Sequence, residues 1–281
     1  MNTIINKSAR SSHLDQQVSV ELITPDVAHE MLGRNTHNRN PRKATVSAYA
    51  RDMLNGDWRW NGESIKFASD GTLLDGQHRL MAVIESGVSV QTLVIRGLPN
   101  EVQETVDGGA KRTFSDVLRL RGETNCTVLA ATVRSVSTWK NGYRSMKGSG
   151  KHTNAQLLST LEEIPWLRDG MTQISRVQAS VHLPASVGGL CWWLFMSIDA
   201  EDANFFFEAL SSGENMAAGD PIYELRRVLS SSQDAIRGER NLTWLLAVVI
   251  KAWNKYRDGE KVAQLKFRPG GANPERMPEP R

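Results

Sequence analysis

Cysteine is scarce in this chain of 281 residues, and long hydrophobic runs are missing. The two cysteines, Cys126 and Cys191, lie far apart in the sequence, which excludes a small disulfide-stapled scaffold and predicts free thiols in a reducing compartment. No apolar run reaches the roughly 18 residues that a membrane-spanning helix needs. Residues 1–17 lack the apolar segment that a secretory signal carries. We therefore expect a cytoplasmic protein with no membrane partner.

Common nucleotide and metal motifs are absent as well. The sequence holds no Walker A motif, no HExxH and no CxxC pair, which sets aside a P-loop and a dedicated zinc site. The 34 lysines and arginines exceed the 31 aspartates and glutamates by a net charge of only +3. This mild excess permits a nucleic-acid partner without arguing for one.

Two types of domain are predicted from the pattern along the chain. Up to about residue 121, alternating strands are interleaved with periodic helices, and beyond it only helical segments follow. The expected fold is therefore α+β, with a small mixed α/β domain followed by an all-helical domain. The predicted boundaries are a flexible N-terminus at 1–17, the mixed domain at 18–121, the helical domain at 122–265 and a disordered tail at 266–281.

The predicted secondary structure is specific enough to test. Strands are expected at 18–23, 64–68, 72–74 and 90–95. Helices of the first domain are expected at 25–33, 41–55, 77–86, 99–106 and 114–121. Those of the second domain are expected at 124–140, 153–163, 183–197, 202–211, 220–232 and 240–257.

The segment that points to chemistry is Asp75-Gly76-Gln77-His78-Arg79, where a strand ends and a helix begins at once. The amides at a helix N-terminus favour an anion, and a glycine lets the backbone approach a phosphate closely. Arg79 can add a bidentate guanidinium, and His78 can donate to a phosphate or transfer a proton. Asp75 can hold a metal, orient its neighbours or cap the helix. The structural alternative is a plain cap, turn and surface charge.

Further candidates lie outside this turn. Glu63 precedes a strand and is a candidate general base or Mg²⁺ ligand, with Asp75 as the second metal ligand. Asn38 and Arg39 are candidates to reach the same phosphates from their loop. Arg112 and Thr113 precede a helix and could bind another phosphate. For each of these groups the alternative is an ordinary solvated loop or helix cap.

The residues Asp75–Arg79, followed by Ala82, resemble the phosphate-binding signature of the ParB/sulfiredoxin superfamily. The preceding order is similar too, with Asn38 and Arg39, then a helix, then a strand near 62–65. The resemblance covers about residues 18–115. It implies a small α/β domain that binds nucleotide phosphates at a helix N-terminus, through Gly76, His78 and Arg79.

The superfamily includes CTP-binding DNA-partition proteins, ATP-using sulfiredoxins, free-serine kinases and ParB-like nucleases, and similar proteins occur in phages and mobile elements. This chain departs from the pattern in two ways. Gln77 stands where sulfiredoxins carry their catalytic cysteine, so thiol chemistry is not expected. The helical half lacks the helix-turn-helix and dimerising tail of partition proteins.

The resemblance and the residues together predict a nucleotide-dependent, DNA-associated protein. It would bind ATP or CTP at Gly76–Arg79 with Mg²⁺ and act as an NTPase (a hydrolase) or a phosphotransferase, with Glu63, Asp75 and His78 as catalytic candidates. One alternative is a non-catalytic DNA-binding or regulatory module. Another is a metal-dependent nuclease. DNA is the expected partner, and a homodimer is left open.

Overall fold

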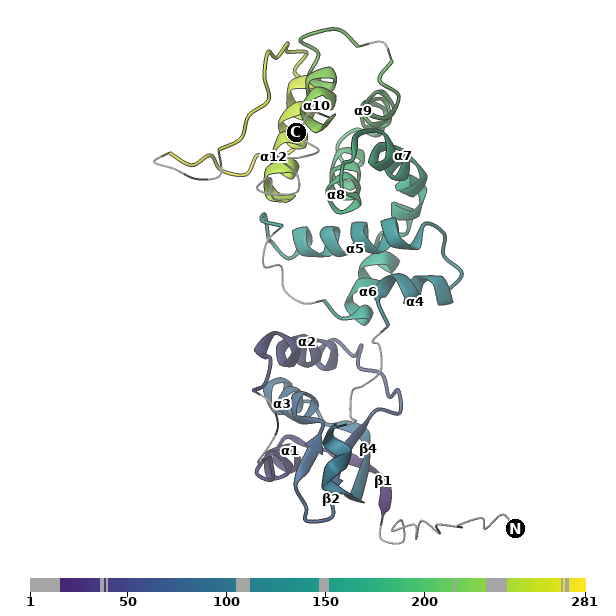
Figure 1. The fold of residues 1–281 in the computed structure, drawn as a ribbon, viewed down its shortest axis with the longest axis vertical. Helices are drawn as coiled ribbons and strands as arrows, with labels where there is room; N and C mark the ends of the chain where they lie inside the picture. Colours follow the sequence, from purple (N-terminus) through teal and green to yellow (C-terminus); the bar gives the residue numbers. More distant parts are fainter. Residues whose placement is uncertain are drawn as a thin grey trace, which may run out of the picture. The chain divides into compact units, whose positions relative to one another are not determined.

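The chain forms two compact units in a computed structural model, Met1–Lys111 and Arg112–Arg281 (Figure 1). The structure describes residues 16–35, 38, 40–104, 112–146, 152–214, 216–230, 242–268, 270 and 273–281. Within these residues the first unit holds a sheet and helices, and the second holds helices without a sheet. The predicted α+β class is therefore confirmed.

The first unit is a four-stranded mixed sheet packed against helices. Its elements are β1 (Gln17–Ile23), α1 (Pro25–Leu32), α2 (Lys43–Leu54), β2 (Ser64–Ala68), β3 (Leu73–Asp75), α3 (Gln77–Ser86), β4 (Val90–Leu98) and the 3₁₀ helix η2 (Asn100–Glu104). The strand order is β1-β4-β2-β3. Strand β4 runs antiparallel to β1 and parallel to β2, and β3 forms an antiparallel hairpin with β2.

Local sequence explains where these elements begin and turn. Thr24 caps α1 by accepting a hydrogen bond from the Val27 amide, and Pro25 occupies the first helical position. In the β2–β3 hairpin, the Asp70 carboxylate accepts from the Thr72 amide at 2.9 Å, and Gly71 takes a positive φ of 86°. This hairpin delivers the end of β3 directly to the start of α3.

One apolar core joins α1, α2 and α3 to the sheet. Every strand and each of these helices contributes buried side chains to it: Ile23, Ala28, Met31, Val46, Ala50, Met53, Ile65, Phe67, Leu73, Leu80, Ala82, Val83, Val90 and Val94. Because α3 buries Leu80, Ala82 and Val83 in this core, its N-terminus is held at the edge of the β2–β3 hairpin.

The second unit is helical in all its described elements. They are α4 (Phe114–Leu120), α5 (Cys126–Lys140), α6 (Asn154–Glu163), the 3₁₀ helix η3 (Pro165–Gly170), α7 (Met171–Val181), α8 (Ala185–Met196), α9 (Ala200–Ser212), α10 (Pro221–Ser230) and α12 (Leu242–Arg257). Helix α8 is apolar around its axis and largely buried, with Ser186, Trp193 and Met196 half-buried. Helices α5, α7, α9 and α12 pack around it.

The boundary between the units differs from the predicted one at residue 121. Helix α4 belongs to the second unit, because Phe114 and Leu118 are buried in the core of that unit. The sequence placed α4 in the first domain because it follows directly on the predicted elements there. A short amphipathic helix does not reveal by its pattern which core receives its apolar side.

The chain end also differs from the predicted disordered tail at 266–281. Phe267 is buried in the helical core, and the Trp244 indole donates a hydrogen bond to its carbonyl at 3.2 Å. The indole of Trp253 donates to the Arg281 carbonyl at 3.0 Å. The composition of the tail, rich in proline, glycine and charge, indicated disorder, but the buried indole of Trp253 and the half-buried one of Trp244 provide partners that composition does not reveal.

Candidate functional site

The predicted strand–turn–helix junction is present at Asp75–Arg79. Strand β3 ends at Asp75, and Gly76 then serves as the N-cap of α3 with a φ of 108°. A residue with a Cβ rarely adopts this backbone conformation, so the turn requires glycine. No side chain caps α3 at this end. The helix therefore presents a partial positive charge at the turn.

Asp75 is bound on both carboxylate oxygens. Its Oδ2 accepts from the Lys66 ammonium at 2.8 Å, and its Oδ1 accepts from the Gly76 amide at 2.7 Å. Lys66 is the residue opposite Asp75 in the β2–β3 register, and both side chains are about three-quarters buried. Asp75 therefore places its own negative charge at the first amide of the turn, where the sequence predicts an incoming phosphate.

Arg79 carries an unsatisfied donor. The residue is half-buried, and its Nη1 atom is buried without a hydrogen-bond partner. Buried guanidinium nitrogens without a partner lose hydration free energy that a bound anion restores. Among the described residues the only other such side-chain atom is the Thr132 hydroxyl of the second unit. Of the side chains at this turn, Arg79 fits an anion best.

Gln77 and Asn38 are parts of an internal polar network. The Gln77 side chain is buried and accepts from the Asn35 amide group at 3.2 Å. Asn38 donates to the Asn35 side chain and to the Leu73 carbonyl, each at 2.7 Å. These two residues hold the loop before α2 against β3. Arg39, the other candidate in this loop, lies outside the described residues.

His78 connects the turn to the start of α2. Its Nε2 accepts from the backbone amide of Arg42 at 3.0 Å. Arg42 is the N-cap of α2, and that helix end also has no side-chain cap. His78, in the first turn of α3, therefore links the N-termini of two helices. Because Nε2 acts as an acceptor, the ring is neutral in this arrangement.

The remaining candidates stand apart from the turn. Glu63 is exposed at the start of β2, and its carbonyl accepts from the Thr92 hydroxyl at 3.3 Å. Thr113 belongs to the second unit and forms a capping box with Asp116 at the start of α4. The Thr113 side chain thus acts as an ordinary helix cap. Arg112 beside it is exposed. Within the described residues, no group of three His, Cys, Asp or Glu side chains could hold a metal ion.

Two residues that contact the turn, Lys66 and Asn35, were not predicted from the sequence pattern. Lys66 lies in the middle of the predicted strand 64–68, and the Asp70-Gly71 turn places this strand opposite 72–75. That pairing could have suggested Lys66 as a partner for Asp75. Asn35 gave no comparable signal, because its role depends on how the loop before α2 folds back onto β3.

Comparison of the chain with family models, with curated proteins and with solved structures finds no match. None of the described helices combines the length and the apolar character needed to cross a bilayer. The geometry of the turn therefore carries the functional argument.

Proposed function

We propose that the turn at Gly76–Arg79 binds the phosphate groups of a nucleoside triphosphate, ATP or CTP, in a nucleotide-dependent, DNA-associated protein of the ParB-like kind. The observation that carries this proposal is the buried Nη1 of Arg79, which has no partner. The uncapped N-termini of α2 and α3 support it, because both favour negative charge near His78.

Phosphoryl transfer depends mainly on positioning and on neutralising charge. In the proposed NTPase or phosphotransferase, Arg79 neutralises charge on the bound phosphates, and the start of α3 orients them. His78 can accept a proton at Nε2 only if its hydrogen bond from the Arg42 amide breaks. Glu63, which is exposed, is the alternative base.

The residues do not fit a Mg²⁺ ion held by Asp75. Both oxygens of this carboxylate are already bound, one by the Lys66 ammonium and one by the Gly76 amide. Asp75 could act as a metal ligand only if its ion pair with Lys66 opened. The proposed reaction therefore does not use a metal at Asp75, and the same ion pair disfavours the metal-dependent nuclease.

A non-catalytic nucleotide switch is the second candidate. Two of the three proposed catalytic groups already form bonds within the protein, which favours this candidate. His78 accepts a hydrogen bond from the Arg42 amide, and Asp75 is paired with Lys66. In this case the turn binds the nucleotide, and the nucleotide alters DNA association without being consumed.

Calorimetric titration with non-hydrolysable ATP and CTP analogues, with Mg²⁺ or with a chelator, tests the binding proposal. Arg79→Ala should weaken binding at least tenfold, whereas Arg59→Ala, an exposed arginine with the same charge change, should alter it less than twofold. Circular dichroism confirms that both variants fold. Equal affinity in wild type and Arg79→Ala would refute the proposal. Consumption of ATP or CTP, measured as loss of the triphosphate, then distinguishes either enzyme from the switch.

A further inference from the structure

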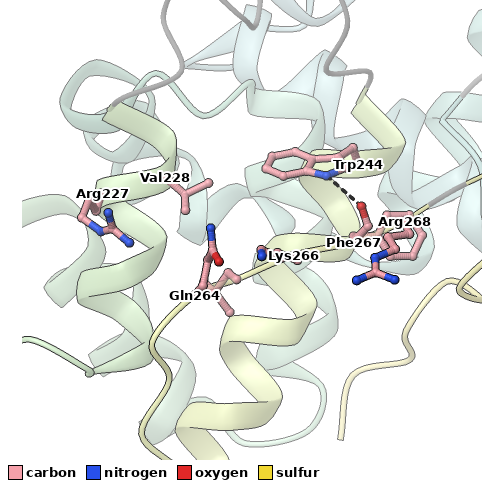
Figure 2. Close-up of a pocket in the computed structure, with 8 residues that line it drawn as sticks. Arg227, Val228, Trp244, Gln264, Lys266, Phe267 and Arg268 are labelled. Carbon is pink, nitrogen blue, oxygen red and sulfur yellow. Dashed lines mark hydrogen bonds between the residues drawn. The ribbon is translucent and has the colours of Figure 1, made fainter.

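A cavity of about 320 Å³ lies in the second unit, lined by α10, the first turn of α12 and the extended segment 264–268 (Figure 2). This volume is at the lower end of the range of about 300–1,000 Å³ for small-molecule sites. Its walls combine polar side chains (Arg227, Gln264, Lys266 and Arg268) with apolar ones (Val228, Trp244, Leu265 and Phe267). Such a mixture suits a ligand that has both an apolar body and an anionic group.

Buried and exposed side chains alternate along the extended segment 264–268, and this alternation separates the apolar wall from the polar one. Leu265 and Phe267 are buried, whereas Gln264, Lys266 and Arg268 are exposed. Successive side chains of an extended chain point to opposite sides, so the apolar residues enter the core and the polar ones reach the rim. Three polar side chains, two of them cationic, therefore stand along one side of the cavity.

The Trp244 ring in the wall of the cavity is held in place by a hydrogen bond. The Trp244 indole donates to the Phe267 carbonyl at 3.2 Å, as Figure 2 shows, and this bond fixes the ring that lines the cavity. An aromatic ring of fixed orientation is a platform on which a planar base can stack, and such stacking does not depend on base identity.

The cationic rim retains unbalanced positive charge. Arg227 is bound by the Glu224 carboxylate, with its Nε 2.9 Å from Oε2. The next acidic residue along the chain, Glu275, donates its backbone amide to the Arg268 carbonyl and pairs its side chain with Lys251. Among the residues that the structure describes, Lys266 and Arg268 form no ion pair themselves. These two side chains are available for a phosphate beside the Trp244 ring.

We propose that this cavity binds a nucleotide unit, with the base against Trp244 and the phosphate at Lys266 and Arg268. Gln264 offers an amide that can hydrogen-bond to the base edge. The unit can belong to a single strand of nucleic acid or to a free mononucleotide. This site is separate from the turn at Gly76–Arg79 and does not depend on it.

Tryptophan fluorescence reports binding, and because the chain has eight tryptophans, substitution of Trp244 assigns the signal to the cavity. The wild-type chain is titrated with a twelve-residue oligothymidylate and, separately, with thymidine monophosphate. At least one ligand should quench the fluorescence, and Trp244→Phe should remove most of that quenching. Quenching by the oligonucleotide alone identifies the strand as the ligand, and quenching by the monophosphate identifies the free nucleotide. Arg79→Ala should leave the quenching intact, which separates this site from the turn.

The cationic rim is tested by the double variant Lys266→Glu/Arg268→Glu, which should weaken binding at least tenfold. The matched control is Arg134→Glu/Arg176→Glu, two exposed arginines on α5 and α7 with the same total charge change, which should alter affinity less than twofold. If the double variant does not fold by circular dichroism, Lys266→Gln/Arg268→Gln replaces it. No quenching by either ligand, undiminished quenching in Trp244→Phe, or equal loss in the control would overturn the proposal.

Discussion

Gly76 packs so closely against Ile65 that a Cβ at position 76 would lie 3.0 Å from Ile65 Cγ1 and 3.3 Å from Ile65 Cα. The second contact is with backbone, which cannot rotate away. The turn at the start of α3 is therefore held directly against β2. Gly76 is required both for its positive φ and for this close approach.

Gly76→Ala should lower the free energy of unfolding of the first unit by about 3 kcal/mol, since backbone strain of about 1–2 kcal/mol adds to overpacking. Gly87→Ala is the matched control, because Gly87 also has a positive φ, of 69°, but a methyl group there would meet no described atom within 4 Å. It should cost only about 1 kcal/mol. Urea denaturation measures both, and equal losses would contradict the steric role of Ile65.

Asp75→Asn should strengthen triphosphate binding about fivefold. The substitution removes the negative charge that accepts from the Gly76 amide, and a partly screened charge of this kind contributes about 1 kcal/mol. Calorimetry, run once with a chelator and once with Mg²⁺, measures the change. If Asp75 is instead a metal ligand, the variant should bind more weakly and lose its response to Mg²⁺.

Two neighbouring glycines of α8 should respond to alanine with opposite signs. A Cβ on Gly189 would overlap the Thr132 side chain of α5, so Gly189→Ala should cost about 3 kcal/mol. A Cβ on Gly188 would meet Ile174 and Leu183 at 3.5 Å, an ordinary contact, so Gly188→Ala should stabilise α8 by about 0.5–1 kcal/mol. Thermal unfolding of both variants measures the difference.

A double-mutant cycle then tests the identity of the overlapping group. Thr132→Ala removes the Thr132 hydroxyl, which is buried without a partner, and should recover at least about 1 kcal/mol in the Gly189→Ala background. Additive effects of the two substitutions would show that the obstruction at Gly189 does not come from the Thr132 hydroxyl or Cγ2, since Thr132→Ala keeps the Cβ that would lie 2.7 Å away.

The first unit should lose stability as the pH falls below about 4.5 because of Glu21. Hydrogen bonds from the Arg96 guanidinium, one of them 3.0 Å long, lower the pKa of this carboxyl from its ordinary value of 4.5. The ion pair therefore stabilises the fold above that pH, and its contribution disappears as the carboxyl is protonated. Both side chains are partly exposed, so this contribution is only about 0.5 kcal/mol.

Glu21→Gln should remove this part of the acid sensitivity, and urea denaturation between pH 3 and pH 7 measures it. The exposed Glu85→Gln on α3 serves as the control and should retain the wild-type decline, because it leaves the Glu21–Arg96 pair intact. An unchanged slope in Glu21→Gln would show that other carboxyls dominate the acid response.

The sequence predicts the elements around the turn well because their signals are local. The alternation at 64–68, the Asp70-Gly71 turn and the helix from Gln77 to Ser86 all appear as expected. Helix α7 is absent from the predicted elements, although Met171, Ile174, Val177 and Val181 follow helical spacing and are buried. Its periodicity was sufficient to predict it.

The contacts of the site are less accessible to sequence. Gln77 was expected to face a phosphate, yet its partner Asn35 stands 42 positions earlier in the chain. The partnership of His78 with the Arg42 amide depends on how α2 packs beside α3. Such partners are set by tertiary packing, and no periodicity records them.

Helix α8 has a consequence for how the second unit opens. Nine of its twelve residues are buried, and helices on several sides cover it. Its backbone amides can reach solvent only when the surrounding helices separate, so deuterium should enter α8 last and at the rate of global unfolding. The amides of the outer helices should exchange with solvent earlier. Helix α8 should therefore be the last segment of the unit to exchange its amide hydrogens.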